Sequence, residues 1–535
     1  MSNQHLFVPI HPIKASLNST FNPKETLTAW AQNSPLGLQV SVVLILVTAL
    51  AILAKNKVQQ TLLTCLFLSR AYDLVTSKLR ATTHNAFSFV IFNLPITAVK
   101  GKEARKAFFE DRNLSNTEGY RIFGGPNAVS KVDENHVHPD KDEHLVRFMM
   151  RITDLVHKDR YTDTMPALFD SVANLMSTWG AQGIMDPFNN IYDVRSTYPV
   201  CRPQTADYYS LQSLQVTLQV NVHMATCREL SSNLRGLSEF KTHFLKVETN
   251  AHPNSVVFPW FFRSFRSSKE ASYKVLNSTL SYYVETRRQA SVPNSDAIDM
   301  LLAQGVSTPE IVLLSLGSIF AGVSNTSKTA IWFLIYISMH PDWKAAIHAE
   351  LEPLVTQYGN AADPIHKRLA AIPVSVWESS MPTIDLVMRE TMRLVINHTA
   401  LRRNVGETFN MAGGVGEIKR GSFLAYTLAD AHLDPSVYPS PHLFDPERFR
   451  PDREEDPSAF LGFGAGRHRC LASKLAKLEI KSIVALFMMN YDYEVVNAKG
   501  NFPETVPVPD YNDIQLARPK NEACFLRFKR TTDDN

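Results

Sequence analysis

Hydrophobic and polar positions divide the chain into one long apolar segment near its start and a mainly helical remainder. The apolar segment, Leu36 to Ala54, reads LGLQVSVVLILVTALAILA and its 19 residues include no charge. As a helix it would rise about 28 Å, roughly the thickness of a bilayer core. Lys55 and Lys57 follow at once, which favours a cytosolic side for the rest of the chain. The pattern predicts a membrane anchor, with a buried core helix as the alternative.

The clearest helix after this segment begins near Ser307 and runs to His340. Ser307 or Thr308 can cap it, and Pro309 suits its first turn. The helix is apolar almost all round, which is typical of a core helix in a large protein or of a membrane span. Small and polar residues interrupt it at Gly317, Gly322, Ser324, Asn325 and Thr326. We therefore interpret it as a central core helix with a functional notch.

Shorter segments complete a mainly α fold with small β-sheets. Helical spacing predicts helices over 101–110, 143–176, 343–358, 383–395 and 471–489, and apolar alternation predicts strands over 422–426, 491–496 and 524–528. The stretch 111–144 is rich in Asn, Gly, Pro and charge and is interpreted as a long loop. No repeat or linker divides the rest, so the predicted organisation is a segment 1–35, an anchor 36–54 and one folded domain 55–535.

The amino-acid composition argues against several classes of protein. The 55 Lys+Arg and 52 Asp+Glu residues give a formal net charge of +3, which argues against a nucleic-acid partner bound by bulk charge. With 44% hydrophobic and 20% charged residues the chain is globular rather than disordered. The five cysteines are odd in number and form no C-x-x-C pair, so neither a disulfide framework nor a zinc site is expected. A lone functional cysteine would be a nucleophile or a metal ligand.

Residues 463–472, FGAGRHRCLA, carry the sharpest chemical signal. Glycines such as Gly464 allow a turn that exposes backbone amides and approaches a flat ligand closely. A helix starts directly after Cys470, and both amides and a helix N-terminus stabilise a thiolate. Arg467, His468 and Arg469 add positive charge for carboxylates. The pattern is that of a thiolate ligand for haem iron, with a small buried cysteine as the alternative.

This segment resembles the ligand loop of the cytochrome P450 (haem-thiolate) superfamily. The family has Phe, a Gly three residues later, a basic residue two before Cys and a small residue two after it. The matching residues here are Phe463, Gly466, His468, Cys470 and Ala472. The resemblance implies a haem b cofactor whose iron takes the Cys470 thiolate as axial ligand, with Phe463 and Gly464 in the cofactor-binding loop.

Two further motifs extend the resemblance. Glu390-Thr-Met-Arg393 matches the family's E-x-x-R, and the segment ending Pro446-Glu-Arg448-Phe449 matches its P-E-R-F. Residues three apart share one helix face, so a carboxylate and a guanidinium so placed can pair. The resemblance implies a buried ionic triad of Glu390, Arg393 and Arg448 behind the haem.

Other haem contacts follow only from position in the family pattern. His468 and one of the neighbouring residues Arg402 and Arg403 match partners of the haem propionates, and Arg403 is the predicted one. The family's W-x-x-x-R helix is not clear here, and His144 and Arg147 are taken to stand in its place.

The central helix departs from the family in an informative way. The family has small-Gly-x-acid-Thr-Thr/Ser, whereas this chain has Ala-Gly-Val-Ser324-Asn325-Thr326. The family's acid and alcohol relay protons during dioxygen activation, and neither Ser nor Asn is a good acid. We predict Ser324, Asn325 and Thr326 as catalytic residues. Either a water chain through Ser324 or Thr326 supplies protons, or the substrate brings its own oxygen; a mere packing role for Asn325 is the alternative.

The resemblance implies a cytochrome P450 fold preceded by a transmembrane helix, and a monooxygenase that puts one oxygen atom from dioxygen into a lipophilic small molecule. Because no flavin or nicotinamide fingerprint is visible, electrons are expected from NADPH through a separate NADPH–cytochrome reductase. Substrate contacts are expected from 112–143, 200–265, 395–401 and 507–511, with Asn397, His398 and Thr399 orienting one polar group. The alternatives are an isomerase or dehydratase that acts on a peroxide without a reductase, and a haem-binding protein without catalysis.

Location follows from the anchor. The prediction is a single-pass endoplasmic-reticulum membrane protein with a cytosolic haem-thiolate domain and a lumenal segment 1–35. Asn18-Ser19-Thr20 would then be a candidate glycosylation site. The Pro259-Trp260 segment is similar to fungal members of the family, in which secondary-metabolite biosynthesis is a common role.

Overall fold

The structure is a computed structural model. It describes residues 36–531, apart from 126–127, 130–131, 133–142, 178, 180, 189–207, 211–212, 251–252, 291–295 and 454–455. The chain separates into two compact units, Met1–Thr61 and Leu62–Asn535. The predicted segment 1–35, with the candidate glycosylation site at Asn18, lies outside the described residues, as does Cys201.

The predicted anchor falls in helix α2, Leu36–Ala81, which continues well beyond Ala54. Its backbone leaves helical geometry at Arg70, where φ is −140° and ψ is 47°. The C-terminal part of α2 belongs to the second unit, where Phe67, Val75 and Leu79 are buried. The first residues of α2 are therefore helical, and their role as an anchor stays a prediction.

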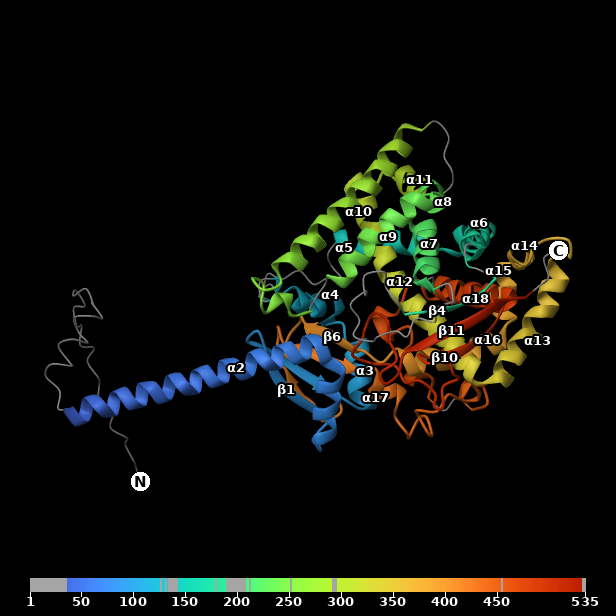
Figure 1. Cartoon of the computed structure of the whole chain (residues 1–535). Helices are drawn as coiled ribbons and strands as arrows, with labels where there is room; N and C mark the ends of the chain where they lie inside the picture. Colours follow the sequence, from blue (N-terminus) through green and yellow to red (C-terminus); the bar gives the residue numbers. More distant parts are fainter. Residues whose placement is uncertain are drawn as a thin grey trace, which may run out of the picture. The chain divides into compact units, whose positions relative to one another are not determined.

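The described residues form two sheets and a short two-stranded ribbon (Figure 1). The first sheet has the order β1-β2-β9-β6-β3, with β1 Ala86–Ile91, β2 Leu94–Val99, β3 Leu114–Ser115, β6 Thr399–Asn404 and β9 Phe423–Thr427. The second has the order β10-β11-β4-β5, with β4 Gln182–Asp186, β5 Tyr208–Ser210, β10 Tyr491–Asn497 and β11 Cys524–Arg530, and β7 Phe409–Met411 pairs with β8 Gly416–Ile418. All residues of β6 and β9 are buried, because these two antiparallel strands form the interior of the first sheet.

The three predicted strands are confirmed, with β9, β10 and β11 within two residues of the expected bounds. The hairpin β1–β2 was not predicted. Its turn residues, Phe92 and Asn93, have φ of 52° and 64°. Such turns usually carry Asn-Gly or Asp-Gly, so Phe-Asn gives little signal.

Helices form most of the second unit. Those described after α2 are α3 Lys102–Glu110, α4 Asn116–Tyr120, α5 Glu143–Leu155, α6 Lys158–Ser177, α7 Ser213–Ala225, α8 Arg228–Ser232, α9 Leu234–Thr249, α10 Arg263–Gln289, α11 Ala297–Ala303, α12 Thr308–Met339, α13 Pro341–Tyr358, α14 Ile365–Ala370, α15 Val374–Ser379, α16 Pro382–Val395, α17 Ala429–His432 and α18 Ser473–Asn490. Single 3₁₀ turns occur at η1 Arg121–Gly124, η4 Pro253–Val256, η5 Pro446–Phe449, η6 Pro457–Ala459 and η7 Gly466–His468. The predicted mainly α fold with small sheets is confirmed, and the predicted stretch 143–176 is two helices, α5 and α6.

Helix α12 runs through the middle of the helical part (Figure 1) and packs against α7, α16, α18 and α10. Every residue from Thr326 to Ser338 is buried, including Trp332 and Phe333. By length and apolar composition α12 would also suit a membrane span. Because its apolar surface is covered by other helices, α12 is the core helix that the sequence predicts.

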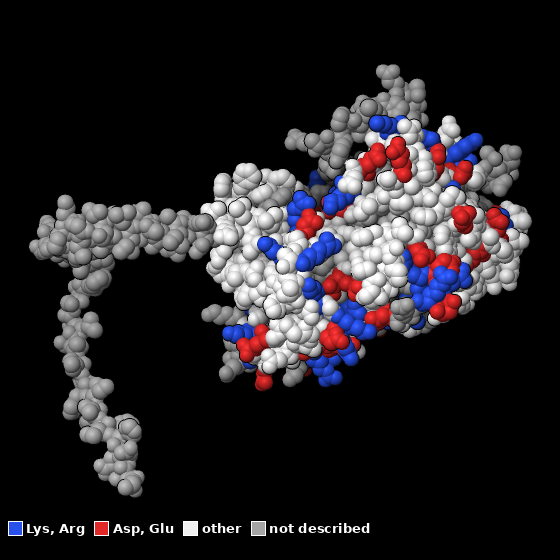
Figure 2. All heavy atoms as spheres, turned by 90° about the horizontal axis from the view of Figure 1, so that it is seen from below, with Lys and Arg blue, Asp and Glu red and all other residues white. Residues whose placement is uncertain are grey.

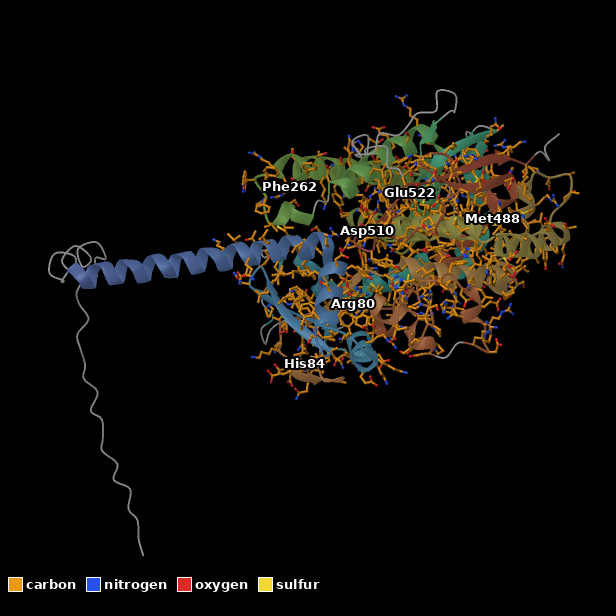
Figure 3. The ribbon with its side chains drawn as sticks, turned by 60° about the horizontal axis from the view of Figure 1, so that its bottom comes forward. Arg80, His84, Phe262, Met488, Asp510 and Glu522 are labelled. Atoms are coloured by element: carbon orange, nitrogen blue, oxygen red, sulfur yellow. The ribbon has the colours of Figure 1, made fainter. Side chains whose placement is uncertain are left out.

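The side chains of the second unit are closely packed around this helix. Figure 3 shows Met488 of α18 among packed side chains, where it is 1% exposed, whereas Phe262 precedes α10 near the surface. On the face drawn in Figure 2, Lys and Arg are interspersed with Asp and Glu. This mixture agrees with the nearly even charge balance of the sequence.

Candidate active site

The segment around Cys470 forms a closed loop before α18. The Cys470 N–H donates to the Phe463 carbonyl at 2.9 Å, and the Gly464 N–H donates to the Leu461 carbonyl at 2.8 Å. Gly464 and Gly466 have φ of 70° and 59°, a region that other residues rarely adopt. A side chain at Gly466 would also overlap the backbone carbonyl of Phe109. The two glycines are therefore required by the shape of the loop.

The Cys470 thiol is both accessible and desolvated. The residue is unbridged and exposed, and the neighbouring Leu471 is 45% exposed. Burial nevertheless raises the pKa of the thiol, although the Ala472 N–H and the Arg469 charge oppose this. A group that is accessible yet desolvated lies in a recess rather than on an open surface. Its thiolate form would need a cationic partner such as a metal ion.

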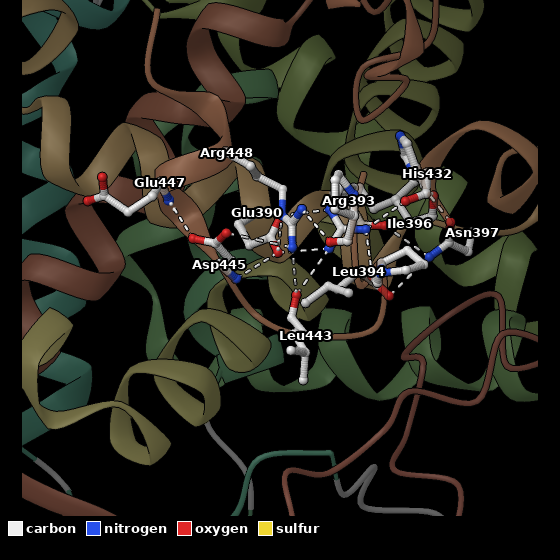
Figure 4. A network of polar contacts seen from close by, with 12 residues as sticks. Glu390, Arg393, Leu394, Ile396, Asn397, His432, Leu443, Asp445, Glu447 and Arg448 are labelled. Atoms are coloured by element: carbon white, nitrogen blue, oxygen red, sulfur yellow. Dashed lines mark hydrogen bonds and ion pairs between the residues drawn. The ribbon is translucent and has the colours of Figure 1, made fainter. Parts of the chain in front are cut away.

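The predicted triad is present (Figure 4). Arg393 donates from Nε and Nη2 to the two carboxylate oxygens of Glu390, each at 2.7 Å, and Arg448 Nε lies 3.3 Å from Glu390 Oε1. Arg393 Nη1 also donates to the carbonyls of His432 and Pro441 at 2.6 and 2.8 Å. Glu390 and Arg393 are fully buried, so these bonds replace the water that both charges lose.

His432, which no sequence motif marks, links this triad to the ligand loop. Its Nε2 accepts from the Leu461 N–H at 2.8 Å, while Nδ1 lies 3.1 Å from the Ile396 carbonyl, so the proton belongs on Nδ1. Burial, together with the charge of Arg393, lowers the pKa of His432 to about 3. The residue ends the short helix α17 and belongs to no motif used above, so only the fold reveals it.

Arg402 and Arg403 are both buried in β6 and differ in their partners. Arg403 Nη1 lies 3.3 Å from Glu118 Oε2, so a carboxylate of the chain already meets its charge. Arg402 Nη1 donates to the Leu401 carbonyl at 2.8 Å, but its Nε has no partner, and burial lowers the pKa of Arg402 to about 10. Among the described residues, no carboxylate pairs with Arg402. Arg402 therefore has a guanidinium nitrogen that could still bind an anion. Arg403, the residue predicted for this role, already pairs with Glu118.

The other predicted cofactor contacts lie on α5 and in η7. Arg147 is exposed on α5 and pairs with Glu143 of the same helix at 3.8 Å. His468 is exposed in η7, within the ligand loop. The side chain of His144 lies outside the described residues.

One face of α12 is exposed although the helix is otherwise buried. Leu313, Gly317, Ala321 and Asn325 are all exposed and are spaced four residues apart, so they form one stripe along the helix. We call these four residues the exposed stripe. Ser324 beside it is half-buried. The notch predicted from the sequence is thus part of a continuous exposed face that runs from Leu313 through two small residues to Asn325.

Thr326 and Gly322 do not belong to this stripe. Thr326 is 3% exposed, and its hydroxyl donates to Glu479 Oε2 of α18 at 3.4 Å. The structure thus separates Thr326 from Asn325, with which it was grouped. A side chain at Gly322 would overlap the Asn221 amide of α7, so this glycine serves helix packing.

Glu479 is a buried carboxyl that belongs to none of the sequence motifs. It is 3% exposed, and its Oε1 has no partner. Burial raises its pKa to about 8, and the hydrogen bond from Thr326 opposes this only in part. The carboxyl is therefore mostly protonated at neutral pH and lies between α12 and the helix that follows Cys470.

These residues fit a haem. An accessible thiol lies on a loop with two left-handed glycines, a buried guanidinium nitrogen of Arg402 is unpartnered, and α12 presents a face of small residues. Such a set would offer haem a thiolate ligand and a partner for its propionates, beside a helix face that bears few bulky side chains.

The comparisons with known proteins decide the family. A family model described as Cytochrome P450 matches residues 213–524, more than half of the chain. The chain belongs to the cytochrome P450 family. It is similar to "Cytochrome P450 monooxygenase AacuE" of Aspergillus aculeatus, at 25% identity over 77% of this chain and 80% of that protein. A second relative, "Cytochrome P450 monooxygenase dmxR5" of Cryptosporiopsis sp., is 23% identical over 79% and 80%.

A solved structure agrees on the fold. The structure titled "Retinoic acid bound cyanobacterial CYP120A1" matches with a TM-score of 0.64 and 18% identity, over 88% of this chain and 96% of that one. The family implies haem-thiolate iron, and the chain is a cytochrome P450 monooxygenase with fungal relatives.

Proposed function

We propose that this P450 inserts one oxygen atom from dioxygen into a lipophilic small molecule, by hydroxylation or epoxidation, in fungal secondary metabolism. The observation that carries the proposal is the accessible, desolvated thiol of Cys470 on its closed loop. The fungal monooxygenase relatives support the biological setting. Leu313, Gly317 and Ala321, the uncharged and mostly small part of the exposed stripe of α12, support a lipophilic substrate.

A haem with a thiolate ligand supplies the electron and dioxygen chemistry of such a reaction when it is bound. Cys470 would be its axial ligand, with the backbone of Phe463 and Gly464 holding the loop closed. Arg402, Arg403 and His468 are the candidate partners of its propionates. Arg402 is the better placed of the two arginines, because Glu118 does not compete for it.

We assign proton delivery to the exposed stripe of α12 and to Ser324 beside it. The Asn325 amide can donate hydrogen bonds from Nδ2, and the half-buried Ser324 hydroxyl can hold a water beside it. Neither group is an acid, so the protons come through water. Thr326 contributes only indirectly, because its hydroxyl is committed to Glu479.

The electrons come from NADPH through a separate NADPH–cytochrome reductase, and the enzyme is held at the endoplasmic-reticulum membrane. The charge-free run 36–54 is the single-pass anchor, residues 1–35 with the candidate glycosylation site Asn18 are lumenal, and residues 55–535 form the cytosolic haem-thiolate domain. The helical backbone of α2 over the whole run supports this assignment.

A second candidate is an isomerase or dehydratase that rearranges a peroxide without a reductase. Asn325 on the exposed stripe favours it, because the family's acid–alcohol pair is missing where dioxygen activation would need it. Turnover without NADPH would distinguish this candidate from the monooxygenase.

The test is the carbon-monoxide difference spectrum of the reduced full-length protein in membranes, beside Cys470→Ala. A strongly red-shifted Soret band in the wild type that is absent in the variant would support the thiolate ligand. Cys524→Ala, which removes a buried cysteine, is the matched control and should keep the band. A wild-type band at the position of histidine-ligated haem, or no haem at all, would overturn the proposal.

A further inference from the structure

A buried lysine follows the exposed stripe on α12. Lys328 is three residues after Asn325 and four after Ser324, so it continues the same side of the helix one turn later. It is 3% exposed, and its Nζ donates to the Ile514 carbonyl at 2.8 Å. An ammonium has three donors, and only this one has a partner among the described residues.

The charge of Lys328 is not paired. Among the described residues no carboxylate lies within 4.0 Å of its Nζ. Asp513 acts on it from farther away and pairs instead with Arg518 at 3.1 Å. Burial lowers the pKa of Lys328 to about 8, so the amine is still mostly protonated at neutral pH. A buried charge without a partner is costly and is seldom kept without a use.

Lys481 on α18 shows how the same fold treats a purely structural buried lysine. It is 2% exposed and donates to the Trp377 carbonyl at 2.8 Å, which matches the bond of Lys328 to Ile514. In addition, its Nζ lies 2.9 Å from Asp385. The two lysines therefore differ in one respect, which is the missing anion at Lys328.

His398 is the second group with unmet capacity. Of the three residues predicted to orient a polar group, Asn397 donates to the Arg393 and Leu394 carbonyls, and Thr399 bonds Thr427 at 3.1 Å. The Nδ1 of His398 has no partner, although the ring keeps some accessible surface. Burial, with the charge of Lys328 nearby, lowers the pKa of His398 to about 3. The neutral ring therefore has one N–H to donate.

We propose that Lys328 and His398 bind one acidic oxygen of the substrate, a carboxylate or an ionised phenol on an otherwise apolar molecule. The inference deepens the proposed function and rests on it for the position of the substrate. The oxygen supplies the anion that Lys328 lacks and accepts from the His398 ring, while the apolar part of the molecule lies along the exposed stripe. In a desolvated site this charge pair is much stronger than in water.

If Lys328 had a purely structural role, its substitution should affect ligand binding in a different way. Lys328 and Trp332 both fasten the segment 514–517 to α12, the latter by donating from Nε1 to the Ala517 carbonyl at 2.9 Å. If Lys328 only fastens this segment, Trp332→Phe should disturb ligand binding in the same way as Lys328→Met, with no regard to ligand charge.

The experiment compares 1-imidazolylalkanoic acids of increasing chain length with their methyl esters, on the full-length haem-loaded enzyme. Affinity is read from the Soret shift, and ligand-induced change in unfolding temperature is a readout that does not depend on haem. At the chain length that reaches Lys328, the acid should bind at least tenfold more tightly than the ester. Lys328→Met should remove this preference, His398→Phe should reduce it, and Lys328→Arg should keep it.

The controls are Lys481→Met and Trp332→Phe, both of which should keep the preference for the acid. Equal binding of acid and ester by the wild type at every chain length would overturn the proposal, and this comparison needs no variant to fold. A preference that survives Lys328→Met would overturn it as well. A wild type without a red-shifted carbon-monoxide band contradicts the proposed function instead, and the unfolding temperatures then still test the acid site by itself.

Discussion

The region behind the ligand loop and the region along α12 treat buried polar groups in opposite ways. Behind the loop, Glu390, Arg393 and His432 meet one another or backbone groups, and their bonds lie between 2.6 and 3.3 Å. Along α12, Lys328 lacks an anion, and Glu479 and His398 each keep an unpartnered atom. Satisfied networks hold a shape, whereas unmet capacity points to something that binds. The first region is satisfied within the protein, and the second is where we propose that a ligand binds.

Arg393→Met breaks the satisfied region and should have the largest effect on stability. It leaves the buried Glu390 carboxylate with the more distant Arg448 and the Asp445 N–H, and the His432 and Pro441 carbonyls lose a donor. Removing one partner of a buried pair costs about 3–5 kcal/mol. Urea unfolding should show this loss, and haem incorporation should fall with it.

Arg266→Met is the control for Arg393→Met, because Arg266 pairs with Glu270 at 4.0 Å and both side chains are exposed. It should change the free energy of unfolding by less than about 1 kcal/mol. A protein that loses Arg393 with as little effect as Arg266 would show that the triad does not hold the fold.

His432 makes the same region sensitive to acid. Its pKa is lowered to about 3 from an ordinary 6.5, so between these pH values the unfolded chain binds a proton that the folded chain does not. Stability should therefore fall as the pH is lowered from about 6.5 toward 3. His432→Gln keeps a donor and an acceptor without titrating and should flatten this slope, at a cost of about 1–2 kcal/mol at pH 7.

The free energy of unfolding measured at several pH values checks the prediction for His432. His366→Gln removes a more exposed histidine, 3.5 Å from Asp170, and serves as the control. If His432→Gln loses stability with acid as steeply as the wild type, other groups govern the acid transition.

Glu479 lies at the border of the two regions and should respond to pH with the opposite sign. Its pKa is raised to about 8 from 4.5, so between these values the folded chain binds a proton that the unfolded chain has released. Stability should fall as the pH rises from about 4.5 to 8. Glu479→Gln should remove this loss and gain on the order of 1–3 kcal/mol at pH 8 relative to pH 5.

Glu494→Gln, which removes an exposed carboxylate 2.8 Å from Arg527, is the control for Glu479 and should leave the pH profile nearly unchanged. A Glu479→Gln variant that is destabilised equally at pH 5 and pH 8 would show that the carboxyl is ionised throughout.

The contrast between the two regions also explains which site residues can be predicted from the sequence. The loop of Cys470 and the triad are short motifs in which each residue type is required by its neighbours, so they could be predicted with their partners. Lys328, Glu479 and His432 act through residues 29 to 186 positions away along the chain, and no local pattern marks such contacts. Arg402 and Arg403 are adjacent and chemically alike, and only the fold, which brings Glu118 to one of them, separates them.

Substitutions of Asn325 test the region along α12 and should have the smallest effect on stability. Because it is exposed on the stripe, Asn325→Ala and Asn325→Thr should change the free energy of unfolding by no more than about 0.5 kcal/mol. Function should change instead. With NADPH and a reductase, Asn325→Ala should release more hydrogen peroxide per NADPH consumed, and Asn325→Thr, which restores the family's alcohol, should release less. If both variants match the wild type in peroxide release while peroxide substrates turn over without NADPH, the isomerase reading of this face replaces the monooxygenase one.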